Sequence, residues 1–129
     1  MMIFRSLAIS LLLGFSTFTF SQNPLFIPDT LSGTVFNLNM EKSTKEFFPS
    51  ITTPTYGFNG NYLGPTLIIN KGDNITLNVS NKLPEPSTVH WHGFHISAKN
   101  DGGPHQIILP STTWSPSFTM LNPASTMWY

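Results

Sequence analysis

Short runs of alternating apolar and polar residues dominate the chain, and turn-forming residues separate them. The clearest run is Ile75–Ser80, in which Ile75, Leu77 and Val79 alternate with polar residues. Because successive side chains of a strand point to opposite faces, this period of two predicts a half-buried strand. Further strands are predicted over residues 34–38, 51–58, 66–70, 88–92 and 113–120.

Turns are predicted where polar, glycine and proline residues cluster. Lys42–Glu46 is predicted to be a polar turn, and Lys99–Pro104 carries a strong turn signal. Pro116 suits only an edge strand or a bulge within its predicted strand. No window shows a sustained helical period, and short strands with frequent turns are typical of a β-sandwich or small barrel. We therefore expect one all-β domain.

The composition excludes several classes of protein. Six basic and six acidic residues cancel, and no basic patch of the kind that binds nucleic acid is present. Charged residues are only 9% of the chain while apolar residues are 40%, which argues against disorder. The chain has no cysteine, so disulfides, a thiolate nucleophile and thiolate metal ligands are all excluded.

Residues 1–21 are predicted to be a secretory signal peptide. Arg5 provides a positive start, Leu7–Leu13 is apolar, and Thr19-Phe20-Ser21 resembles a cleavage site. An uncleaved anchor and a buried N-terminal helix are the alternatives. With cleavage, residues 22–129 form the mature chain, without membrane attachment, and its location is periplasmic or secreted.

One motif carries metal chemistry, the run His90-Trp91-His92-Gly93. In a strand, residues two apart share a face and lie about 6.6 Å apart. Two imidazoles at this spacing suit one metal ion or two neighbouring ions, and imidazole alone does not select among copper, zinc, iron and nickel. The alternative is that both histidines simply face solvent. Trp91 is expected to point into the core.

An ordered set of further motifs frames the two histidines. The set resembles the N-terminal cupredoxin-like (plastocyanin-like) domain of multicopper oxidases, and is most similar to bacterial periplasmic copper-efflux and laccase-like enzymes. It comprises Asn59–Thr66, Lys71-Gly72-Asp73, Thr88–Gly93, Asp101-Gly102-Gly103-Pro104 and Pro123–Tyr129. The resemblance implies a cupredoxin-like Greek-key β-sandwich or barrel over residues 22–129.

The resemblance also implies roles for three residues. His90 corresponds to a ligand of the type 2 copper, and His92 to a ligand of the type 3 copper pair. Asp101 corresponds to an acidic residue that helps deliver protons to the oxygen being reduced, a reaction that consumes protons. The alternative for Asp101 is a turn former before Gly102. His95 and His105 match no ligand of the family and are expected to have structural or surface roles, although an accessory copper contact stays open.

In the family that this chain resembles, the position of Tyr129 is followed by a second His-x-His, by further strands and by C-terminal cupredoxin domains. We therefore expect a C-terminally truncated, incomplete domain that lacks the blue-copper cysteine and most cluster ligands, so whether this chain alone is an enzyme stays open. The parent oxidase would couple oxidation of a reducing substrate to reduction of dioxygen to water. The alternative is a non-catalytic cupredoxin-like copper-binding module or a pseudogene product.

Overall fold

The computed structural model describes residues 25–129, and the expected signal peptide over residues 1–21 lies outside them. Seven strands and one short 3-10 helix make up the regular structure of this part of the chain. The strands are β1 (Thr30–Ser32), β2 (Val35–Phe48), β3 (Ile51–Phe58), β4 (Thr66–Ile68), β5 (Asn74–Asn81), β6 (Thr113–Trp114) and β7 (Ser117–Thr119), and the helix is η1 (Ala98–Asn100).

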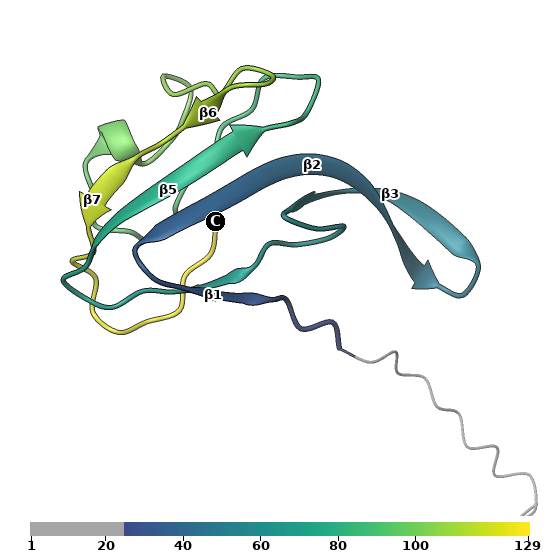
Figure 1. The fold of residues 1–129 in the computed structure, drawn as a ribbon, viewed down its shortest axis with the longest axis horizontal. Coiled ribbons are helices and arrows are strands. Elements are labelled where there is room, and N and C mark those ends of the chain that lie inside the picture. Colours follow the sequence, from purple (N-terminus) through teal and green to yellow (C-terminus); the bar gives the residue numbers. More distant parts are fainter. Residues whose placement is uncertain (1–24) are drawn as a thin grey trace, which may run out of the picture.

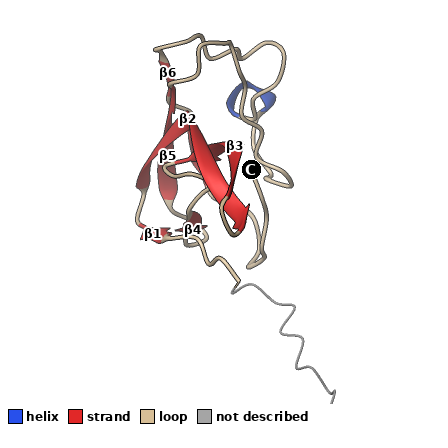
Figure 2. Ribbon diagram, turned by 90° about the vertical axis from the view of Figure 1, so that its right-hand side faces the viewer, coloured by secondary structure: helices blue, strands red, loops and turns tan. Residues whose placement is uncertain are grey.

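The strands form two sheets that do not close into a barrel. The larger sheet has the order β3-β2-β5-β6, and β7 also pairs with β5. Within it, β2 and β5 are parallel, whereas β2–β3, β5–β6 and β5–β7 are antiparallel. β1 and β4 form a separate parallel pair, seen below β2 and β5 in Figure 1. Figure 2 shows η1 as the single helical turn of the described chain, which confirms the predicted all-β class.

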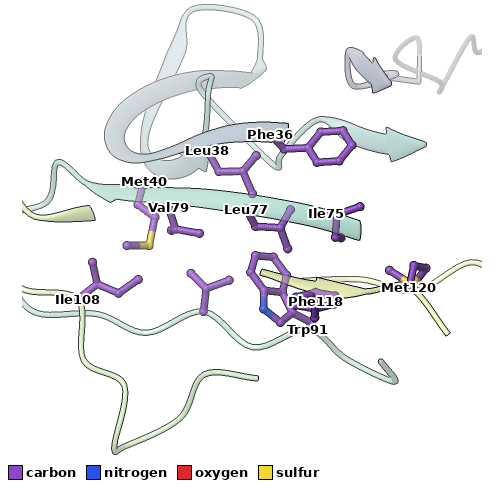
Figure 3. Close-up of a cluster of buried hydrophobic side chains, with 11 residues drawn as sticks. Phe36, Leu38, Met40, Ile75, Leu77, Val79, Trp91, Ile108, Phe118 and Met120 are labelled. Carbon is purple, nitrogen blue, oxygen red and sulfur yellow. The ribbon is translucent and has the colours of Figure 1, made fainter. Parts of the chain in front are cut away.

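The hydrophobic core lies on one face of the larger sheet. Alternate residues of β2 and β5 are buried, as the period of two predicts, and they point toward Trp91 and Phe118 (Figure 3). Burying these side chains removes apolar surface from water, the main favourable term in folding. The core comprises Phe36, Leu38, Met40, Ile75, Leu77, Val79, Val89, Trp91, Ile108, Phe118 and Met120.

The prediction of a polar turn at Lys42–Glu46 is wrong. These residues lie within β2, and each pairs with a residue of β3, from Lys42 with Tyr56 to Glu46 with Thr52. Beyond Met40 the strand leaves the core, and none of its residues is buried, so polar residues suit it. The chain reverses instead at Pro49–Ser50, where Ser50 has a positive φ of 62°.

The predicted strand over residues 113–120 is divided at Ser115–Pro116 into β6 and β7. Proline has no N–H to donate to a ladder, which interrupts the pairing with β5. The Pro116 carbonyl still accepts a hydrogen bond of 3.1 Å from the Leu77 N–H. The segment is therefore extended and strand-forming, as predicted, but it makes two short strands and not one.

The prediction of a regular strand over residues 88–92 is wrong. Only isolated bridges flank it, Ser87 with Ile108 and His92 with Trp128. The alternation of buried and exposed side chains nevertheless persists along the segment, since Val89 and Trp91 are buried and His90 and His92 are exposed. Within residues 25–129, no helix has the length and apolar character of a membrane span.

Candidate metal centre

Trp91 anchors the segment that carries the two histidines. Its side chain is 1% exposed, and its indole Nε1–H donates a 3.0 Å hydrogen bond to the carbonyl of Asn100. The indole stacks on Trp114 and Phe94 with ring-centroid distances of 6.2 and 6.3 Å. Because Trp91 points into the core, as expected from the sequence, His90 and His92 on either side of it point outward.

The two imidazoles lie close together on the exposed side of this segment. Their ring centroids are 5.8 Å apart and the ring planes meet at 74°. Imidazole nitrogen is a ligand for copper, zinc, iron and nickel. The structure therefore brings together the two histidines that the sequence singled out, in one place open to a metal ion or to further ligands.

His90 is oriented by Asp101. The His90 Nδ1 atom lies 3.1 Å from the Asp101 backbone carbonyl oxygen and 3.1 Å from its Oδ1 atom. Because a carbonyl oxygen can only accept a hydrogen bond, we assign the proton to Nδ1, which leaves Nε2 as the free lone pair. A hydrogen bond of this kind on the second ring nitrogen is the usual way in which a protein orients a histidine ligand.

The Asp101 carboxylate is only partly satisfied. Its Oδ1 atom is buried without a well-oriented hydrogen bond, although it approaches His90 Nδ1. The Asp101 side chain as a whole is 31% exposed, so the group has access to solvent. Asp101 thus contacts His90 through its backbone carbonyl and also presents a carboxylate oxygen at the site.

Gly102 allows the Asp101 turn to approach the histidine segment. It has a positive φ of 74°, and a Cβ atom there would lie 1.8 Å from the Val89 carbonyl oxygen. Gly103 N–H also donates a 2.9 Å hydrogen bond to the Thr88 hydroxyl. Only glycine combines this conformation with so short a backbone separation. Gly102 therefore allows the Asp101 backbone carbonyl to reach His90 Nδ1.

His92 is oriented differently, by Trp128. Their rings stack with centroids 4.0 Å apart and an interplanar angle of 21°. The His92 backbone N–H donates a 2.9 Å hydrogen bond to the Trp128 carbonyl. No hydrogen bond to the His92 imidazole occurs within the described part of the chain, so both of its ring nitrogens stay open there.

The segment that carries Trp128 is fixed on both sides. On one side, the buried Asn122 amide donates to the Gly93 carbonyl at 2.9 Å and contacts Met127 Sδ at 3.5 Å. On the other side, the Tyr129 hydroxyl donates a 2.8 Å hydrogen bond to the Pro65 carbonyl. Burial raises the pKa of Tyr129 to about 12, because the charged phenolate is poorly solvated there.

The other two histidines are exposed and lie outside this pair. The His95 backbone N–H is bonded to Asn122 Oδ1, and His105 Nε2 lies 3.3 Å from the Ala98 carbonyl. Across residues 25–129, no three histidine, aspartate or glutamate side chains form a group able to hold a metal ion. The described chain therefore offers part of a metal site, with two imidazoles as its donors.

Sequence reasoning missed two contributors to this site. Asn122 and Trp128 contact the histidine segment from 29 and 36 residues away in sequence, through contacts that no local pattern reveals. Trp128 was recognised only as part of the terminal motif of the family, without a role. Its position beside His92 is a result of the fold.

A comparison with protein families matches residues 39–129 to the multicopper oxidase domain. The multicopper oxidase Mco of Staphylococcus aureus is 42% identical over 94 residues, which are 73% of this chain and 21% of the relative. The cell division protein FtsP of Escherichia coli is 32% identical over 111 residues, 84% of this chain and 24% of that protein. The chain thus spans about a fifth to a quarter of the length of these relatives.

Solved structures agree with the sequence comparison. The laccase-like multicopper oxidase CueO from Ochrobactrum sp. superposes with a TM-score of 0.77 at 33% identity, covering 79% of this chain and 24% of that one. A laccase from Pediococcus acidilactici gives a TM-score of 0.77 at 30% identity, with 83% and 25% covered. These neighbours confirm the expected cupredoxin-like β-sandwich. The chain belongs to the multicopper oxidase family.

Proposed function

We propose that residues 22–129 form the N-terminal cupredoxin-like domain of a laccase-like multicopper oxidase, with residues 1–21 as its signal peptide. The observation that carries this proposal is the paired, outward-facing imidazoles of His90 and His92. The apolar run of Leu7–Leu13 after Arg5 supports a periplasmic or secreted location. The family match and the laccase-like neighbours support the same assignment.

The residues at the site fit copper. Imidazole nitrogen suits copper, and His90 presents Nε2 because its Nδ1 faces the Asp101 carbonyl. His90 would hold the type 2 copper and His92 one copper of the type 3 pair. Copper at such a site supplies the one-electron redox chemistry that reduction of dioxygen requires. The chain contributes by holding two imidazoles at a fixed separation and angle.

Asp101 would act as the proton-delivering residue. Its Oδ1 atom is buried without a well-oriented hydrogen bond, and it lies 3.1 Å from the His90 Nδ1 atom. A carboxylate with spare acceptor capacity and partial solvent access can take a proton from water and pass it inward. The backbone carbonyl of Asp101 holds His90 independently of that exchange.

The rest of the reaction depends on residues that these 129 do not include. Two imidazoles leave a copper coordination shell incomplete, and the blue-copper site needs a cysteine thiolate, which this chain lacks. We infer that further cupredoxin domains supply the other ligands, oxidise a reducing substrate and pass electrons to dioxygen, which is reduced to water. Reading the coding sequence after the Tyr129 codon should reveal a second His-x-His, and its absence would contradict this inference.

A non-catalytic copper-binding module is the second candidate. It is kept because one relative that is not named as an oxidase, the cell division protein FtsP of Escherichia coli, matches 84% of this chain at 32% identity. Both candidates use His90 and His92 to bind copper, so the pair does not decide between them. The two candidates differ in how tightly the chain should bind copper by itself.

Copper titration of the purified chain tests the proposal. An oxidase domain with an incomplete ligand set should bind one Cu²⁺ weakly, and His90→Ala or His92→Ala should weaken binding by at least about tenfold. His95→Ala and His105→Ala are the matched controls and should leave the affinity unchanged. Tight stoichiometric binding abolished by His90→Ala would favour the binding module, whereas affinity indifferent to His90 and His92 would contradict both candidates.

A further inference from the structure

Trp128 contacts His92 through both its backbone and its ring. The backbone contact is an isolated antiparallel bridge in which the His92 N–H donates to the Trp128 carbonyl at 2.9 Å. The ring contact is a stack with centroids 4.0 Å apart and planes inclined by 21°. Together they fix both the position of His92 along the chain and the plane of its imidazole.

The two histidines are thus oriented by different means. His90 has a hydrogen-bond acceptor, the Asp101 carbonyl, at its Nδ1 atom. His92 has no such hydrogen bond among the described residues, and its ring would otherwise be free to rotate. A stacked aromatic pair is worth roughly a few-fold to tenfold in an equilibrium constant beyond the area it buries.

Stacking suits a metal ligand because of where the lone pair lies. The nitrogen lone pair of an imidazole lies in the ring plane, so an indole on the ring face leaves the nitrogen free. A hydrogen bond would instead occupy one of the two nitrogens. The stack therefore restricts the orientation of the imidazole and keeps both possible ligand atoms accessible.

Trp128 can restrain His92 because its own segment is held on both sides. Asn122 bonds the Gly93 carbonyl and contacts Met127, and Tyr129 reaches the Pro65 carbonyl and packs against Trp91 with ring centroids 5.8 Å apart. The indole itself is 66% exposed and takes no part in the buried core. Its exposed position is consistent with a role toward His92 and not with a role in core packing.

We propose that Trp128 is a positioning residue for His92, which it orients for copper binding by ring stacking. The proposal rests on the proposed function, because it assigns His92 to a copper ion. Trp128 contacts no metal itself and acts through the imidazole. Trp128→Leu removes the aromatic face, whereas Trp128→Phe retains it.

The test measures Cu²⁺ affinity of the full chain by competition with a chelator. Trp128→Leu should weaken binding by about threefold to tenfold, the range expected for a lost aromatic stack, and Trp128→Phe should restore most of that loss. Tyr56→Leu is the matched control, because it removes another exposed ring, 57% exposed and on β3, and should leave the affinity unchanged.

A double-mutant cycle separates positioning from loss of structure. In a His92→Ala background, Trp128→Leu should have no further effect on the residual binding through His90, because the ring it orients is gone. A further loss in that background would mean that Trp128 acts on the whole structure, and it would overturn the proposal. So would an unchanged affinity in Trp128→Leu while His92→Ala weakens binding. If His92→Ala itself has no effect, the proposed function at His92 fails as well.

Discussion

Gly102→Ala should damage both the stability of the fold and the orientation of His90. A Cβ atom at this position would lie 1.8 Å from the Val89 carbonyl oxygen, 2.7 Å from its carbonyl carbon and 3.3 Å from the His90 nitrogen. All three neighbours are backbone atoms, so no change of side-chain rotamer relieves the overlap. The turn must move away from the Val89–His90 segment.

The cost has two parts. Holding alanine at the observed φ of 74° costs about 1–2 kcal/mol. Moving a packed backbone to relieve an overlap costs roughly another 1–3 kcal/mol. We therefore expect Gly102→Ala to lower the free energy of unfolding by about 2–5 kcal/mol. The same movement lengthens the contact between the Asp101 carbonyl and His90 Nδ1, so copper affinity should fall too.

Gly72→Ala separates the conformational cost from the cost of the backbone overlap. Gly72 has a φ of 94°, and a Cβ there meets nothing within 4 Å, so this variant has only the conformational cost. Urea unfolding followed by tryptophan fluorescence should give a loss of about 1–2 kcal/mol for Gly72→Ala, with copper affinity unchanged. Equal losses of stability in the two variants, or an unchanged copper affinity in Gly102→Ala, would refute the argument from close approach.

Three further outcomes follow from the contacts. Asp101→Asn keeps the backbone carbonyl that faces His90, so Cu²⁺ affinity should stay within about twofold in a chelator competition, and a larger loss would make the carboxylate the anchor. Burial raises the pKa of Tyr129 from 10.0 to about 12, so the unfolded chain loses the phenolic proton at lower pH than the folded chain does. The contribution of Tyr129 to the free energy of unfolding is therefore intact below pH 10 and is lost as the pH rises toward 12. Urea midpoints across that range should fall less steeply in Tyr129→Phe. Asn81→Leu leaves the Leu83 N–H and the Glu85 carbonyl without the Asn81 side chain as partner, while the Ile108 carbonyl keeps the Ser87 N–H. Urea unfolding should therefore show a loss of at least about 2 kcal/mol.

The parts of the fold that local pattern determines were predictable. β5 has the expected alternation because one face of the sheet packs on the core and the other does not. β3 has the predicted bounds, Ile51–Phe58, since β-branched and aromatic residues end there at Asn59-Gly60. Lys42–Glu46 was misread because a strand that projects beyond the core can be polar on both faces. Its pairing with β3, and not its composition, makes it a strand.

Local sequence pattern likewise predicts some features of the candidate metal centre and not others. The shared outward direction of His90 and His92, with Trp91 inward, follows from alternation and is confirmed. The nearness of Asp101 to His90 was not predicted, because it depends on how closely the turn at Gly102 approaches Val89. The stacking of Trp128 on His92 had no local signal, since it requires the chain to return after 36 residues.

Trp91 links the core to the site, and this connection explains how a segment without regular strand pairing can hold two imidazoles in place. Its indole stacks on both Trp114 and Phe94, and its N–H is bonded to the Asn100 carbonyl, one residue before Asp101. One buried side chain therefore positions both the backbone of the histidine pair and the turn that contacts His90. Because packed cores relax only partly around a cavity, a substitution at Trp114 should alter the histidine geometry without touching either histidine.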